Sequence, residues 1–144
     1  MSLWVLDTDH VSLLLSRHPQ VSRRVSETGK DAAITVVTVQ ELFNGWVVRI
    51  NEAKEIQDLV RLYGKLSRTV EFCKQVPVLE FDRAAGDCYQ RMLLANPSLS
   101  KKRLPKDLRI AAIALAAGAV VATRNKRDFS QFPGVLLTDW TREE

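Results

Sequence analysis

The sequence predicts an α/β protein, a three-layer α/β/α sandwich around a central, mostly parallel sheet of four to five strands. Short apolar segments alternate along the chain with longer amphipathic ones, which is the order of strands and helices in α/β folds. Each apolar segment is a continuous run, as expected for strands that are buried on both faces of a parallel sheet. The length of 144 residues and the hydrophobic content of 46% suit one core, so we expect a single domain over residues 1–144.

The N-terminal part contains the first two expected strands. Residues 3–6 form an apolar run that ends at the string Asp7-Thr8-Asp9, whose side chains can stop a strand and cap a helix. Residues 32–37 are a second buried run with several β-branched side chains. Thr38 is expected to open the following helix, and Glu41, three positions later, fits the reciprocal half of a capping box.

The middle of the chain is expected to be largely helical. Apolar residues recur at steps of three and four over residues 51–74, which predicts an amphipathic helix, or a pair of helices broken near Gly64. Residues 77–81 form the third expected strand. Asp82 then suits the cap of a helix that runs to about residue 94.

The C-terminal part supplies the last two strands. A largely buried helix is expected from Asp107 onward, ended by Gly118, and residues 119–123 form the fourth strand. A polar turn over residues 124–128 then leads to a short fifth strand at residues 135–137.

Acidic residues follow several of these strands. In open parallel sheets the ligand lies outside the carboxyl ends of the strands. Asp7 follows the first strand, Glu41 lies in the helix after the second, and Asp128 lies in the turn after the fourth. Asp107 begins the helix that leads into the fourth strand. Each acid, taken singly, also suits a turn or a helix cap, and this alternative stays open from the sequence.

Four carboxylates at one edge would require a cation. At about 4 Å, two carboxylates repel by about 1 kcal/mol in water and by about 4 kcal/mol at an effective dielectric constant of 20. A donor set made only of oxygen suits Mg²⁺, for which Mn²⁺ can substitute, rather than zinc or copper. Such a site is suited to the hydrolysis of phosphodiester bonds.

Charge favours an anionic partner. The formal net charge is +4, and the excess is concentrated in two basic clusters. The first comprises Lys101, Lys102, Arg103 and Lys106, and the second comprises Arg124, Lys126 and Arg127. Such clusters are often only solvated surface, but these lie beside the acidic positions.

Other classes of protein are disfavoured. No segment is predicted to span a membrane or to act as a secretory signal, so we expect a cytoplasmic protein. Cys73 and Cys88 are interpreted as reduced structural thiols. His10 and His18 lack a Cys/His cluster, which disfavours zinc, and both are expected to be exposed or half-buried near the first helix.

Several motifs occur in the order seen in PIN domains. They are Val5-Leu6-Asp7-Thr8-Asp9, Thr38-Val39-Gln40-Glu41-Leu42, Pro105-Lys106-Asp107 and Thr123-Arg124-Asn125-Lys126-Arg127-Asp128-Phe129. The closing segment Phe132-Pro133-Gly134-Val135 with Asp139-Trp140 is similar to the C-terminus of VapC-type toxins from toxin–antitoxin pairs. The resemblance to this family extends over essentially the whole chain.

The resemblance implies a magnesium-dependent endoribonuclease that cuts cellular RNA, such as tRNA or rRNA, and is neutralised by a VapB-type antitoxin. It also implies a homodimer. The positions matching Asp7, Glu41, Asp107 and Asp128 would form the catalytic metal site. Thr123 and Asn125 match small polar residues that orient this site, while Lys106, Arg124 and Lys126 would contact the RNA.

Two positions depart from the family pattern, and one helix is a candidate partner surface. Asp9 stands where many relatives have Asn or Ser, and it could add a water-mediated ligand or cap a helix. Asn125 stands where some PIN nucleases have an acid. The antitoxin is expected to cover apolar residues near Phe43, Trp46 and Val47, which could otherwise be core.

Two other functions compete with the nuclease. Haloacid-dehalogenase-like phosphatases also have Asp-x-Asp after their first strand, but we find no convincing paired-acid motif downstream. A non-catalytic α/β module that binds RNA or protein would use the same acids only as caps. Dependence of RNA cleavage on divalent ions separates the nuclease from such a module.

Overall fold

A five-stranded parallel sheet forms the centre of the molecule. The computed structural model describes residues 2–101 and 105–142, with the exception of the Lys101 side chain. The strand order is β3-β2-β1-β4-β5, and every neighbouring pair is parallel. The strands are β1 (Trp4–Leu6), β2 (Ala32–Thr35), β3 (Val78–Leu79), β4 (Val120–Ala122) and β5 (Leu136–Thr138). The predicted parallel sheet is confirmed, although most strands are shorter than the apolar runs. Strand β2 is buried throughout as predicted, whereas the edge strands β3 and β5 are partly exposed.

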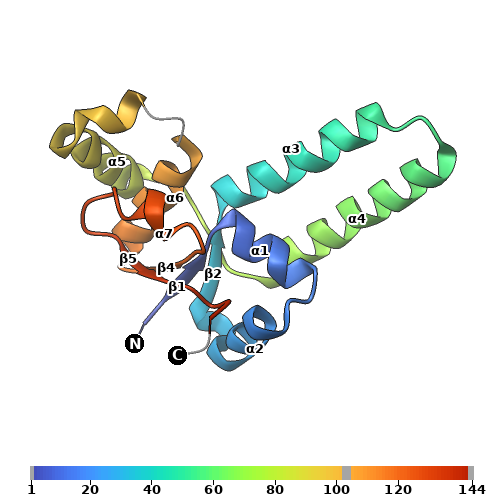
Figure 1. Ribbon diagram of the computed structural model, residues 1–144, viewed down its shortest axis with the longest axis horizontal. Coiled ribbons are helices and arrows are strands. Elements are labelled where there is room, and N and C mark those ends of the chain that lie inside the picture. The colour runs from blue at the N-terminus through green and yellow to red at the C-terminus, as the bar shows by residue number, and fades with distance from the viewer. Residues whose placement is uncertain (1, 102–104, 143–144) are drawn as a thin grey trace.

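Helices cover the sheet on both sides (Figure 1). They are α1 (Thr8–Leu15), α2 (Pro19–Thr28), α3 (Val36–Glu52), α4 (Ile56–Gln75), α5 (Arg83–Ala95), α6 (Pro105–Ala117) and the single turn α7 (Lys126–Phe129). Two short 3₁₀ segments, η1 (Gly29–Asp31) and η2 (Pro97–Lys101), complete the described elements. None of the described helices combines the length and the apolar character that a membrane span requires.

The sheet separates two hydrophobic cores. Successive side chains of a strand point to opposite faces. Val5 accordingly packs in the core under α5, α6 and α7, while its neighbour Leu6 packs in the core under α1 to α4. In β4, Val121 and Ala122 divide in the same way. Trp140, which is 1% exposed, closes the second core. The three-layer α/β/α architecture predicted from the sequence is therefore confirmed.

The chain changes direction across the sheet at β1. From β1 the chain adds β2 and β3 on one side, and β4 and β5 are then added on the other side. The segments that follow β1 and β4 therefore diverge at the carboxyl edge, which is where open α/β sheets bind ligands. Because α6 leads into the amino end of β4, its own N-terminus lies at that same edge.

A long helical hairpin projects from the body of the protein. Figure 1 shows α3 and α4 side by side, extending together away from the sheet. Of the two alternatives for residues 51–74, the single helix is confirmed from Ile56 onward and the break near Gly64 is not found, because α4 continues through this residue and the chain turns between Glu52 and Ile56. A glycine inside a helix costs only about 1 kcal/mol relative to alanine, which the packing of α3 on α4 can offset.

Capping residues set the ends of other helices. The predicted cap Asp82 is confirmed, because its Oδ1 accepts a hydrogen bond of 2.9 Å from the Ala85 amide. Gly118 ends α6 with a φ of 68°, a left-handed conformation that favours glycine. The segment before β2 contains two helices, α1 and α2, separated by a turn in which Arg17 has a φ of 62°.

Candidate active site

Asp7 lies at the centre of the carboxyl edge. It follows β1 directly, its side chain is buried, and it caps α1 through a hydrogen bond of 2.8 Å from the His10 amide to Oδ1. The expectation that Asp7 could serve as a cap is thus correct for one oxygen. Among the described residues, the second oxygen has no hydrogen-bond partner, so it remains available for a ligand.

Glu41 is oriented by hydroxyl groups rather than by a helix cap. The hydroxyl of Thr8 donates to Oε1 of Glu41 at 2.7 Å, and Thr8 Oγ1 lies 3.0 Å from Thr38 Oγ1. The expected capping box of Thr38 and Glu41 is wrong, because α3 begins at Val36 and Thr35 caps it by accepting from the Thr38 amide. Glu41 therefore lies in the second turn, beyond the reach of the free amides, and its carboxylate faces Thr8 of α1.

The four predicted acids interact at Asp107. Burial, followed by the negative charges of Asp7, Glu41 and Asp128, raises the pKa of Asp107 to about 6. Asp107 lies in the first turn of α6, two residues inside the helix, so it is not the expected N-cap. The acids after β1, in α3 and in α7 are thus close enough to Asp107 of α6 to oppose its ionisation.

Asp128 is held by a neighbour in the loop after β4. The side chain of Asn125 donates from Nδ2 to Oδ2 of Asp128 at 2.7 Å. The backbone N–H of Asn125 donates to the Thr123 hydroxyl at 2.8 Å. Thr123 has no exposed surface. Its hydroxyl can therefore orient the loop, as expected of a positioning residue, but it has no surface with which to contact RNA.

Asp9 forms an ion pair instead of a cap. Both of its oxygens accept from Arg124, at 2.7 Å from Nε and 2.8 Å from Nη2. This bidentate pair joins the first turn of α1 to the end of β4, and the cap of α1 is Asp7. Asp9 also lies within 4.8 Å of Asp7 and His10 through one ligand atom of each. Asp9 was predicted to act near the metal and Arg124 to contact the RNA, but in the structure these two residues pair with each other.

The pairing also bears on the phosphatase alternative. That reading needs Asp9 as a free acid beside a nucleophilic Asp7. In the structure both oxygens of Asp9 are instead engaged by the Arg124 guanidinium, so neither is free to face a substrate.

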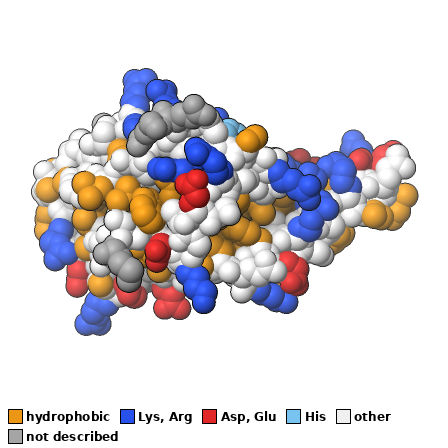
Figure 2. Space-filling view, turned by 90° about the horizontal axis from the view of Figure 1, so that it is seen from below, with side chains coloured by type: hydrophobic (Ala, Val, Ile, Leu, Met, Phe, Trp, Pro, Cys, Tyr) orange, Lys and Arg blue, Asp and Glu red, His pale blue; other side chains and the backbone are white. Residues whose placement is uncertain are grey.

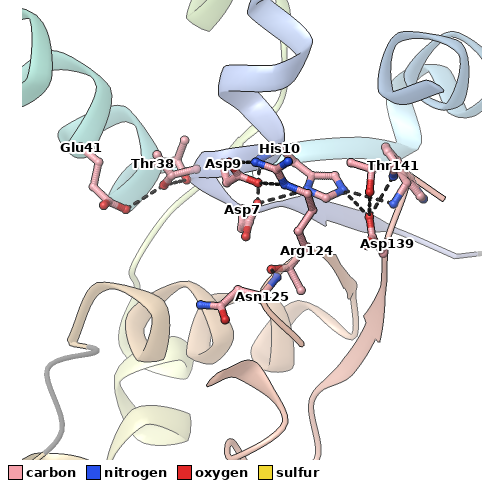
Figure 3. A network of polar contacts seen from close by, with 12 residues as sticks. Asp7, Asp9, His10, Thr38, Glu41, Arg124, Asn125, Asp139 and Thr141 are labelled. Atoms are coloured by element: carbon pink, nitrogen blue, oxygen red, sulfur yellow. Dashed lines mark hydrogen bonds and ion pairs between the residues drawn. The ribbon is translucent and has the colours of Figure 1, made fainter. Parts of the chain in front are cut away.

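His10 was wrongly expected to be exposed or half-buried. It is fully buried, and its Nε2 accepts a hydrogen bond of 3.2 Å from the Trp140 amide. Its Nδ1 lies 3.4 Å from Oδ1 of Asp7, and Nε2 lies 3.8 Å from Oδ1 of Asp139 (Figure 3). Asp139 is itself buried, a condition that raises a carboxyl pKa, but hydrogen bonds from Thr141 lower the pKa of Asp139 below its usual value. The ring therefore connects Asp7 to the C-terminal segment.

The basic residues flank the acids. Lys126 and Arg127 are exposed on α7, and Lys106 is half-buried in the first turn of α6. Lys102, Arg103 and the Lys101 side chain, which belong to the first predicted basic cluster, lie outside the described residues.

The donor set fits a hard divalent cation. The four acids present carboxylate oxygens and no sulfur, and like charges brought together from four elements are disfavoured unless a cation or protons neutralise them. The raised pKa of Asp107 is the sign expected for such a cluster in the absence of a metal.

The acid cluster predicts an inverse dependence of stability on pH in the metal-free protein. A carboxyl whose pKa is raised by folding binds its proton more tightly in the folded state, so the free energy of unfolding should fall as pH rises from about 4 through about 6. We expect a loss of about 1 to 2 kcal/mol, which allows for solvent screening of a half-exposed group. Urea unfolding in EDTA across this pH range measures it. Asp107→Asn should flatten the dependence, and an unchanged slope in this variant would contradict the assignment.

The buried His10 predicts a second effect on stability. His10→Ala leaves a cavity and an unpaired Trp140 amide, so the free energy of unfolding should fall by about 3 kcal/mol. In His10→Gln the side-chain carbonyl can accept from the same amide, and a smaller loss is expected. Urea denaturation of both variants tests this, and equal stability of His10→Ala and the unchanged protein would refute it.

Comparisons with known proteins identify the fold. No family model matches this sequence, and no curated protein matches it. Solved structures do match: a chain of the DNA-bound VapBC of Salmonella typhimurium superposes with a TM-score of 0.79 and 24% identity, over 97% of this chain and 99% of the other. VapBC2 from Rickettsia felis, bound to a promoter DNA fragment, gives 0.75 and 20% over 96% and 98%. FitAcB from Neisseria gonorrhoeae gives 0.73 and 20% over 98% and 100%. The chain therefore has the PIN-like fold found in VapBC-type complexes.

Proposed function

We propose that this protein is a VapC-type toxin, a magnesium-dependent endoribonuclease that hydrolyses phosphodiester bonds in cellular RNA, such as tRNA or rRNA, in the cytoplasm. The observation that supports it most directly is the pKa of Asp107, raised to about 6 by burial and by Asp7, Glu41 and Asp128. Acids that merely capped separate, distant helices would not contribute to the pKa of Asp107. The PIN-like fold, similar to chains of VapBC complexes, supports the same function.

Asp7, Glu41, Asp107 and Asp128 would hold Mg²⁺, for which Mn²⁺ can substitute. When bound, the cation activates the attacking water and neutralises the charge that grows on the phosphoryl oxygens. Thr8 fixes the rotamer of Glu41, and Asn125 fixes that of Asp128. These hydrogen bonds hold the acids in place before the substrate arrives, so little reorganisation is required during the reaction.

The remaining roles concern the RNA. Lys126 begins α7 and Lys106 lies in the first turn of α6, beside the acids, where ammonium groups can hold phosphates. Arg124 would contribute to RNA binding only through the part of its positive charge that Asp9 does not offset.

Replacement of Asp7 should separate catalysis from capping. Asparagine caps helices as well as aspartate, so Asp7→Asn should fold while losing one carboxylate, and RNA cleavage should fall by at least about 100-fold. Asp82→Asn is the matched control, because Asp82 makes the same type of cap at α5. Cleavage of a labelled RNA with Mg²⁺ or with EDTA measures both variants.

The alternatives give different results in this assay. Persistent cleavage by Asp7→Asn would refute the site. A protein that binds RNA but never cleaves it, with or without divalent ions, would be the non-catalytic module. Trapping of an acyl-phosphate on Asp7 would indicate the phosphatase, because the proposed hydrolysis forms no covalent enzyme intermediate.

We also propose that a VapB-type antitoxin neutralises the protein and that the protein forms a homodimer. Helix α3 offers the apolar surface expected for the antitoxin: Val47 is 49% exposed, and Phe43 and Trp46 are half-buried. Neither Phe43 nor Trp46 belongs to the two cores.

The partner surface can be tested with a charged substitution. Val47→Asp should weaken co-purification with a candidate antitoxin expressed from the neighbouring gene by at least about tenfold. The new carboxylate would lose its hydration in an apolar contact without gaining a partner. Leu94→Asp is the control on the distant helix α5, where the replaced side chain is 81% exposed. Growth arrest by the Val47→Asp protein should persist in the presence of the antitoxin. Equal retention of both variants would place the contact elsewhere.

A further inference from the structure

A basic groove extends from the acidic site along the helical hairpin. It has a volume of about 540 Å³ and lies between α1, α3 and α4. Thr8 and Glu41 line it together with Arg49, Lys65 and Arg68. Glu41 and Arg49 are eight positions apart on α3, which places them on one face of the helix about 12 Å apart along its axis. Gly45, midway between them, adds no side chain to the groove.

An indole ring fixes two of the cations. Trp46 donates from Nε1 to the Thr69 hydroxyl at 2.9 Å, and Thr69 in turn donates to the Lys65 carbonyl at 3.0 Å. The guanidinium carbon of Arg49 lies 5.1 Å from the centre of the ring, and Nζ of Lys65 lies 5.8 Å from it. Cation–π contacts of this kind reduce the entropy that a long side chain loses when it binds an anion.

The groove cations have no carboxylate partners within the described part of the chain. No acid lies within 4.0 Å of Arg49, Lys65 or Arg68 in residues 2–101 and 105–142. On the same helix α4, by contrast, Arg61 pairs with Asp58 at 3.6 Å and Lys74 pairs with Glu71 at 3.3 Å. Figure 2 shows Lys and Arg side chains on the hairpin, at the right of the view. The positive charge of the groove is therefore left for an external anion.

We propose that this groove binds the sugar–phosphate backbone of the RNA on one side of the bond to be cleaved. The inference rests on the proposed ribonuclease function and adds a substrate-binding segment to it. The groove begins at Glu41, so a strand whose scissile phosphate lies at the acids can continue directly along Arg68, Lys65 and Arg49. Its cations suit successive phosphates, since they follow the helix axis and have no carboxylate partner among the described residues.

A protein segment is the other candidate occupant. An apolar segment would require a run of apolar anchors, whereas this groove combines three cations with hydroxyl groups and only a few apolar side chains. The exposed apolar residues of the hairpin, such as Val47 and Val60, do not line it. The chemistry of the groove therefore favours a polyanion.

Binding of RNA to catalytically inactive protein tests the groove apart from the reaction. The probe is a fluorescein-labelled, short single-stranded RNA titrated with Asp7→Asn protein in Mg²⁺, followed by anisotropy. The double change Lys65→Ala and Arg68→Ala should raise Kd by at least about tenfold at low salt and lower the slope of log K against log salt by about 1.4. Arg68→Ala alone, which leaves the contacts of Trp46 intact, should give part of both effects.

The control removes the same charges from the same helix. Arg61→Ala with Lys74→Ala deletes one Arg and one Lys that are already paired, and Kd should change by less than about twofold. Equal losses in the two double variants would mean that RNA senses only net charge and would overturn the groove. Unchanged RNA binding in Lys65→Ala and Arg68→Ala would do the same, and if antitoxin binding were lost instead, a protein segment would be the occupant.

The outcome also separates this inference from the proposed function. If the unchanged protein cleaves RNA in Mg²⁺ and the groove variant binds RNA normally, the groove inference fails and the ribonuclease stands. If the unchanged protein neither binds nor cleaves RNA, both fail. Circular dichroism melting of each variant confirms that a loss of affinity is not a loss of fold.

Discussion

The rest of the structure depends on the repulsion among carboxylates that the fold brings to one edge of the sheet. The strand order places β1 beside β4, so the segments that follow these two strands are neighbours at the carboxyl edge. Helices α3 and α6 each add an acid there. In metal-free protein this arrangement opposes folding, as the raised pKa of Asp107 indicates. A site of this kind persists only because burial elsewhere outweighs its cost, and two separate cores, one on each face of the sheet, supply that burial.

Three of the four acids have a neutral neighbour that restricts their position without neutralising their charge. These neighbours are the His10 backbone amide for Asp7, the Thr8 hydroxyl for Glu41 and the Asn125 side-chain amide for Asp128. A cationic partner would relieve the repulsion but would also compete with a metal for the same oxygens. Among the described residues, the bidentate ion pair at this edge joins Arg124 to Asp9, an acid outside the group of four.

The sequence was most informative where a local pattern determines the structure. Continuous apolar runs predicted the parallel strands, and the position of acids after those runs predicted which edge would hold them. It was less informative where distant residues decide. Thr35 and Thr38 both suit a helix cap. Thr35 is the cap because the pairing of β2 with β3 ends at this residue and α3 begins directly after it. The choice between one helix and a pair broken at Gly64 stayed open, because the packing of α3 on α4 cannot be read from the sequence. His10 meets Trp140 across 130 residues, and Asp9 meets Arg124 across 115, so neither contact has a local signal.

The distribution of charge shows how an acidic pocket is compatible with the proposed action on RNA. The acids are concentrated in one half-buried region, where a divalent cation can reverse their effect, while unpaired cations lie outside it, in the groove of the hairpin and on α7. Separation of the positive from the negative side chains matters because a cation placed among the acids would form an internal ion pair, as Arg124 does with Asp9, and would no longer be free to bind phosphate. In the hairpin α3–α4 the groove begins at Glu41 of the acidic site, and its cations lie further along the two helices, away from the acids. The projection of this hairpin from the sheet, which contributes little to the cores, is then explained as a support for charge.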